Sequence, residues 1–280
     1  MDCPYCGNRN FEFAQRCSSC GRDLGYPNVH ASQKREEVAA LNSRWEAVHQ
    51  RAIQRGTETV LNLFEQELRK SKAVLCRRLG TANWLISSDN IHLGSFWLEV
   101  DAGIRTPEDN EFDRARAAVD ATFFPYYHQH IRFAALSLNG LGPLAYGACS
   151  IVLRDSYISH RASVSEENTL VFCRRHGIIV GHAPPVGYRA SWDDRHRLAA
   201  AKLGDKLEQH MGVNDFPTIL LQQAKGTDEV DFVEVHIFGS LNQMSIERMV
   251  IPKDELSTPE NQILVEGIRA KLGVERVVCV

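Results

Sequence analysis

The chain has 280 residues, of which 44% are hydrophobic and 24% charged, so a folded protein of one large or two modest domains is expected. Thirty-five acids against 32 lysines and arginines leave a net charge of -3, which disfavours general nucleic-acid coating but leaves local recognition open. No apolar run approaches the roughly 18 residues that span a bilayer. The N-terminus shows no signal peptide. We therefore expect a cytoplasmic protein with no membrane partner.

Four of the eight cysteines form two Cys-x-x-Cys pairs near the N-terminus: Cys3 with Cys6, and Cys17 with Cys20. Glycine follows each pair, and glycine tolerates the positive φ that a tight metal-binding turn requires. Four thiolates close a tetrahedral site around a structural Zn²⁺. The spacing predicts a zinc ribbon over residues 1–25 that folds around its metal. It resembles the short ribbons at the N-terminus of many bacterial proteins, which bind nucleic acid, bind protein or cap a domain.

After a linker at residues 26–32, apolar residues recur every three or four positions and predict a helical linker over residues 32–78. The pattern then changes to a mixed α/β domain over residues 79–280. Helices are expected at 110–138, at 192–210 and from Thr258, which caps a helix that begins with Pro259. Short strands or buried turns are expected at 84–86 and 96–100. Strands are expected at 150–153, 169–172, 178–180, 218–221, 232–237 and 274–280. This order predicts an α+β fold with a split antiparallel-type sheet.

Strict alternation over residues 232–238 places Glu234 and His236 on one face of a strand, between Phe232 and Phe238. Valine and isoleucine occupy the other face, which is expected to form the core. An ionisable pair flanked by phenylalanine favours a cleft. The alternative is an edge strand on which both side chains face water.

A second polar region follows the strand at 150–153. It begins with Arg154 and continues through Arg161, Ser163 and Ser165. Guanidinium groups hold phosphates bidentately, and small hydroxyls hold a ribose or brace a strand. An ordinary polar turn is the alternative. Arg189, Arg195 and Arg197 make the helix near 192–210 locally basic, and a solvated face is the expectation there.

Residues 144–252 resemble bacterial ADP-ribosyltransferase-type toxin domains. The likeness starts at Tyr146-Gly147, passes through an aliphatic strand to an Arg-small-Ser segment, and ends at Glu234 with a Gly239-Ser240-Leu241 turn. The resemblance implies NAD as co-substrate and Glu234 as the catalytic carboxylate that bonds the ribose 2′-hydroxyl. It implies cofactor-binding roles for the residues Tyr146, Arg154, Arg161, Ser163 and Ser165. Whether Arg154 or Arg161 is the equivalent arginine stays open.

The sequence departs from the family at Phe232, where a Glu or Gln that often chooses a protein acceptor usually stands two residues before the catalytic Glu. The acceptor is therefore open between nucleic acid and protein. The resulting hypothesis is an intracellular ADP-ribosyltransferase, a toxin or defence effector, which a cognate antitoxin could accompany. The alternative is a non-enzymatic zinc-ribbon module that binds nucleic acid or protein.

Overall fold

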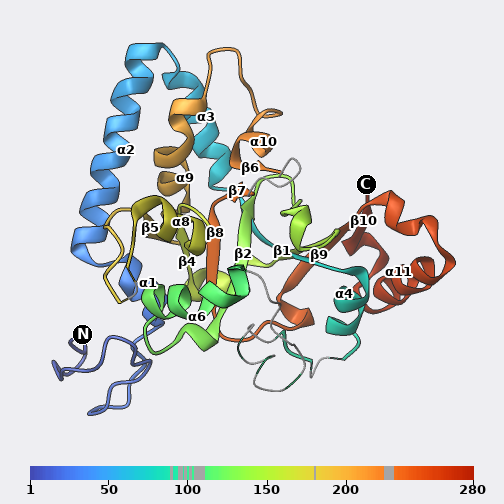
Figure 1. Ribbon diagram of the computed structural model, residues 1–280, viewed down its shortest axis with the longest axis horizontal. Helices are drawn as coiled ribbons and strands as arrows, with labels where there is room; N and C mark the ends of the chain where they lie inside the picture. The colour runs from blue at the N-terminus through green and yellow to red at the C-terminus, as the bar shows by residue number, and fades with distance from the viewer. Residues whose placement is uncertain are drawn as a thin grey trace.

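A computed structural model describes residues 1–88, 91–93, 97, 100, 103, 111–179, 181–223 and 230–280 (Figure 1). Its centre is an eight-stranded sheet in the order β10-β9-β3-β1-β2-β8-β4-β5, antiparallel in its described pairs except for β9 with β10. A small N-terminal ribbon precedes it. The expected α+β class is confirmed.

The strands of the main sheet are β1 (Lys72–Arg77), β2 (Ile131–Ser137), β3 (Cys149–Leu153), β4 (Ala162–Ser165), β5 (Arg189–Ser191), β8 (Glu234–Phe238), β9 (Ile246–Ile251) and β10 (Val277–Cys279). A second, two-stranded sheet pairs β6 (Leu221–Gln222) with β7 (Asp231–Phe232). The helices are α1 (Pro27–Ser32), α2 (Arg35–Arg55), α3 (Glu58–Leu68), α4 (Leu79–Leu85), α6 (Glu111–Phe123), α7 (Asp155–Ile158), α8 (Thr169–His176), α9 (Arg195–Leu203), α10 (Phe216–Leu220) and α11 (Pro259–Leu272).

The helices cover the two faces of the sheet unequally. The main hydrophobic core lies on the face that packs against α2, α3, α4, α9 and α11. In Figure 1, α2, α3 and α9 stand side by side, with α4 and α11 at the opposite end of the sheet. The other face, over β2, β8 and β4, is covered by α1, α6 and α8 through an aromatic cluster. The candidate site lies under this second cover.

The helix expected over residues 32–78 is instead two helices followed by a strand. α2 ends where Gly56 adopts a left-handed φ of 69°, and α3 ends at Leu68. β1 follows at once and lies in the middle of the sheet, between β3 and β2. A boundary between residues 78 and 79 would therefore divide the sheet. The two helices pack on α9 and are not a free linker.

Other short apolar runs also adopt a different structure from the expected one, because such runs suit a helix as well as a strand. Residues 169–172 belong to α8, residues 84–86 reach the end of α4, and residues 218–220 belong to α10. The helix expected at 110–138 is α6 followed by β2, and that at 192–210 is the shorter α9. Ile178 and Ile179 lie outside any strand, whereas residue 180 and most of 96–100 lie outside the described residues.

Several elements are confirmed: the strands β3 and β8, the C-terminal β10 and the helix α11. The Thr258 hydroxyl accepts a hydrogen bond from the Asn261 N–H and caps α11 as expected. Within the part of the chain that the structure describes, no helix is long and apolar enough to cross a membrane.

Candidate functional site

The four N-terminal cysteines form the expected metal-binding cluster. Their sulfur atoms all lie within 4.8 Å of one another. The Cys3 and Cys20 sulfurs are 3.7 Å apart, and those of Cys6 and Cys17 are 3.6 Å apart. Zn–S bonds of about 2.3 Å at tetrahedral angles place sulfurs about 3.8 Å apart. The spacing therefore suits one structural zinc ion with all four positions filled by protein.

Two matching turns build this cluster. The Gly7 N–H donates to the Cys3 carbonyl and the Gly21 N–H to the Cys17 carbonyl, each at 2.9 Å. Both glycines have left-handed φ angles, 72° and 69°, as the sequence predicts. Backbone N–H groups of Cys20 and Ser19 lower the pKa of the Cys17 thiol to about 6. Cys17 is thereby prepared as the thiolate that zinc binds.

Four polar side chains, Ser163, Ser165, Glu234 and His236, form a buried group that we call the polar ladder. Ser163 lies opposite His236, and Ser165 opposite Glu234, across the antiparallel pair β4–β8. Each is 2–3% exposed, although the face is opposite the main core. β8 lies between β2 and β4, so the alternation expected for this strand is confirmed and the edge-strand alternative is wrong.

Three donors hold the Glu234 carboxylate. Asn168 Nδ2 donates to Oε1 at 2.9 Å, and the Thr169 N–H donates to Oε2 at 3.1 Å. The ring N–H at Nε2 of His236 also donates to Oε2, at 3.0 Å. Asn168 and Thr169 begin α8, so the positive end of this helix faces the carboxylate. Oε1 receives a single bond from the described residues and can accept another.

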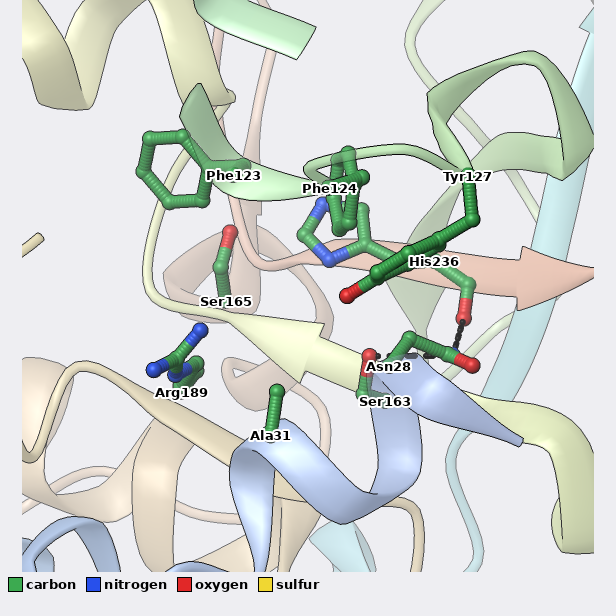
Figure 2. Close-up of a pocket in the computed structure, with 9 residues that line it drawn as sticks. All are labelled: Asn28, Ala31, Phe123, Phe124, Tyr127, Ser163, Ser165, Arg189 and His236. Atoms are coloured by element: carbon green, nitrogen blue, oxygen red, sulfur yellow. Dashed lines mark hydrogen bonds between the residues drawn. The ribbon is translucent and has the colours of Figure 1, made fainter. Parts of the chain in front are cut away.

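Aromatic side chains cover the polar ladder. The Phe124 ring centre lies 4.7 Å from that of His236, and Phe123 and Tyr127 complete the cover (Figure 2). The remaining cavity is about 10 Å³, lined by Asn28, Ala31, Phe123, Phe124, Tyr127, Ser163, Ser165, Arg189 and His236. A cavity of this size holds about one water molecule. A dinucleotide can enter only if part of the cover moves.

Helix α1, in the segment expected to be a linker, forms part of that cover. Asn28 is 2% exposed. Its Nδ2 donates to Ser163 Oγ at 3.2 Å and to the His236 carbonyl at 3.0 Å (Figure 2). It also donates to the Arg161 carbonyl at 3.1 Å. No hydrogen bond joins Ser163 Oγ to the His236 ring among the described residues, so a Ser–His nucleophile pair is not assembled.

The structure places three other predicted site residues elsewhere. The Arg161 guanidinium donates to the carbonyls of Tyr157, Phe238 and Ser240 and braces the end of β8. Burial lowers its pKa. Arg154 donates to the Ile246 carbonyl at 2.8 Å, beside β9. Tyr146 packs edge-on against Phe232, with ring centres 6.3 Å apart. Ser163 and Ser165 line the cavity, and Glu234 shares their face of the sheet without lining it. Arg161, Arg154 and Tyr146 do not line the cavity.

Arg189 lies beside the polar ladder, although the sequence predicts a solvated helix face for it. It lies in β5 opposite Ser165 and lines the cavity. Its Nε donates to Glu37 Oε1 at 2.5 Å, and the Glu37 carboxylate is fully buried. The alternation Arg189-Ala190-Ser191 is a strand signal that could have located it. Asn168 could have been found as the capping residue before a helix.

No known protein family matches this sequence, and no curated protein is similar to it.

Proposed function

We propose that the chain is an NAD-dependent ADP-ribosyltransferase with Glu234 as its catalytic carboxylate. The observation that carries the proposal is the polar ladder. Ser163 and Ser165 lie far from Glu234 in the sequence but share with it one buried face of two adjacent strands. These are the three ladder residues that the family resemblance assigns to NAD chemistry.

The environment of Glu234 suits this chemistry. Breaking the nicotinamide–ribose bond leaves the electron pair on nicotinamide and positive charge on the ribose. A fixed carboxylate stabilises that charge by several kcal/mol, and more strongly where water is excluded. Asn168 and His236 hold the carboxylate in place. The free acceptor capacity of Oε1 allows a bond to the ribose 2′-hydroxyl.

The neighbouring side chains supply the remaining contacts. Ser163 and Ser165 offer hydroxyls to the nicotinamide amide, and Phe124 and Tyr127 offer rings for stacking. Arg189 replaces Arg161 and Arg154 in the proposal, because it lies opposite Ser165 and lines the cavity at the ladder. A guanidinium binds a diphosphate through paired N–H donors.

The proposed acceptor is a macromolecule, nucleic acid or protein, which the zinc ribbon would help to bind. Action as an intracellular toxin or defence effector, with a cognate antitoxin as partner, belongs to the same proposal. A reducing cytoplasm suits it because all eight cysteines are free thiols and four of them form the zinc cluster.

Incubation with labelled NAD tests the proposal. The full chain should transfer label to itself, RNA, DNA or lysate protein, and Glu234→Gln should abolish the transfer. Glu208→Gln is the matched control, because the Glu208 side chain is 63% exposed. Ser163→Ala should reduce transfer without removing a charge. If calorimetry detects no NAD binding to the folded wild type, the proposal is refuted.

A specific observation favours the alternative of a non-enzymatic binding module. Phe11, Phe13 and Tyr126 are 74%, 37% and 82% exposed. The Phe11 and Phe13 rings stack with centres 5.3 Å apart, and the Tyr126 ring lies tilted against Phe13 at 5.0 Å. Exposed stacked rings bind bases or apolar side chains of a partner. For a binding module alone, Glu234→Gln leaves partner affinity unchanged, whereas loss of Cys3 and Cys6 removes it.

A further inference from the structure

A second and larger cavity lies away from the polar ladder, where β3 ends and β9 begins. This basic cleft has a volume of about 370 Å³ and is lined by Arg154, Tyr157, Gln243, Met244, Lys271, Leu272 and Arg276. Arg154 directly follows β3, and Lys271 and Leu272 end α11. The volume falls within the range of small-molecule sites. None of its lining residues lines the cavity at the ladder.

Three cations meet in this cleft without an acidic partner. Among the described residues, no carboxylate lies within ion-pairing distance of Arg154, Lys271 or Arg276. Asp155 directly follows Arg154, and Glu247 directly follows Ile246. Both carboxylates pair with Lys72 instead, at 3.2 and 2.9 Å from its ammonium. Glu275 raises the pKa of Arg276 only as a weaker, third influence.

Two of these cations are held side by side by the backbone. Arg154 Nε and Arg276 Nη2 both donate to the carbonyl of Ile246. Arg276 Nε and Nη1 donate to the carbonyls of Glu247 and Leu272, at 2.9 and 3.1 Å. Burial, and then the charge of Arg154, lower the pKa of Arg276. Like charges fixed together in this way favour an anion between them.

We propose that the basic cleft binds the phosphate groups of a small organic phosphate of the nucleotide class. The Nη atoms of Arg154 make no hydrogen bond to any described residue and present a fork that suits a phosphate. The Lys271 ammonium adds a positive charge on a flexible side chain. Each Nη of Arg276 donates one proton to a backbone carbonyl and has a second proton available for a phosphate. Phosphates bound by several such donors are held by charge-assisted bonds.

The other lining residues suit the organic part of the ligand. The Tyr157 hydroxyl and the Gln243 amide make no hydrogen bond to the described residues, so both are available to bond polar groups of the ligand. Met244, 53% exposed, and Leu272 form an apolar wall. The volume of about 370 Å³ and the net charge of -3 favour a small molecule over a nucleic-acid strand.

Calorimetry on the full chain with ADP, pyrophosphate and adenosine tests the proposal. ADP should bind most tightly, pyrophosphate more weakly and adenosine not measurably. Lys271→Gln and Arg154→Gln should each weaken ADP binding at least about tenfold, since one charge-assisted bond is worth about 1.5–3 kcal/mol. Arg154 also braces the Ile246 carbonyl, whereas Lys271 is exposed, so Lys271→Gln tests the site even if Arg154→Gln is destabilised.

Two controls separate this site from the polar ladder. Lys253→Gln, at an exposed lysine outside the cleft, should bind ADP as the wild type does. Glu234→Gln should also bind ADP in the basic cleft as tightly as the wild type does, whether or not the chain catalyses ADP-ribose transfer at Glu234. The proposal is overturned if ADP does not bind, if Lys271→Gln and Arg154→Gln bind it normally, or if only an oligonucleotide binds. Equal affinities for ADP and pyrophosphate would overturn the role of Met244 and Leu272.

Discussion

Glu234 is a carboxylate at the start of the interior strand β8, 3% exposed and with three hydrogen-bond donors committed to it. Burying a carboxylate costs several kcal/mol unless donors compensate, and an apolar residue would serve packing alone at less cost. Such an arrangement is typical of functional sites. The burial of Glu234 and its three hydrogen bonds therefore indicate a functional role for this carboxylate.

The same geometry predicts the stability of the variant used to test it. Glu234→Gln places an amide NH₂ against one of the donors Asn168, Thr169 or His236, since all three require an acceptor. One donor then stays buried without a partner, which costs about 1–3 kcal/mol. Urea denaturation should show this loss, and Glu208→Gln should show none. Unchanged stability would mean that the carboxylate is not held by these donors.

His196 predicts a pH dependence. It is 3% exposed, and burial, followed by the charge of Arg69, lowers its pKa. The folded chain therefore resists protonation more than the unfolded chain does. The contribution of neutral His196 to the free energy of unfolding is fully present above the unfolded pKa of about 6.5. It is lost as the pH falls through the lower pKa of the folded chain. His196→Gln should reduce the loss of unfolding free energy between pH 7 and 5.

The control for this prediction is His210→Gln, because the His210 side chain is 76% exposed. Its denaturation curves should follow the wild type at both pH values. Superimposable profiles for His196→Gln and the wild type would contradict the assignment of the pH effect to His196.

At the scale of elements, the ribbon and the sheet have separate cores. Cys3, Cys17 and Leu24 pack together apart from the main core. Removing zinc with a chelator should unfold the ribbon, because so small a unit depends on its metal. The main thermal transition should remain. Metal analysis should find about one zinc per chain, and Cys17→Ser should lose it. Loss of the main transition on chelation would show that the two units fold together.

Helix α1 predicts how the polar ladder is opened. Asn28→Ala removes three hydrogen bonds that fix α1 over β4 and β8. The loss should cost about 1–3 kcal/mol. It should also increase NAD binding or transfer if α1 limits access. Asn214→Ala, at an exposed asparagine that does not line the cavity, is the matched control. A variant that is less stable but no better at binding NAD would assign α1 a purely structural role.

The sequence predicts elements best where local signals and tertiary packing agree. The alternation around Glu234 locates β8 and the buried polar face, and Thr258-Pro259 locates α11. Local signals do not predict that Lys72–Arg77 forms the strand β1 or that Thr169–His176 forms the helix α8. The run at 73–76 fits a helical stripe until its partners β2 and β3 are known, and residues 169–172 are apolar enough for a strand. The roles of Arg161 and Arg189 depend on strand pairing across the sheet, which no local pattern encodes.

At the scale of the whole molecule, the fold begins well before the boundary expected at residue 79. β1 supplies the central pairing between β3 and β2, and α3 buries Leu61 and Phe64 completely. The Phe64 ring packs against Phe216, with centres 5.0 Å apart. Without residues 27–78, the sheet would be divided and its main apolar face would lose the part of its cover that α2 and α3 supply.

A chain of residues 79–280 should therefore fail to fold cooperatively, whereas residues 27–280 should unfold in one cooperative transition near that of the full chain. The shorter chain loses a central strand together with α2 and α3, and the hydrophobic stabilisation lost is about 25 cal/mol for each Å² of apolar surface left uncovered. Circular dichroism during heating, with binding of a hydrophobic dye, measures both outcomes. A cooperative transition for residues 79–280 at the temperature of the full chain would show that β1 is dispensable and that the helices at 35–68 are a separate unit.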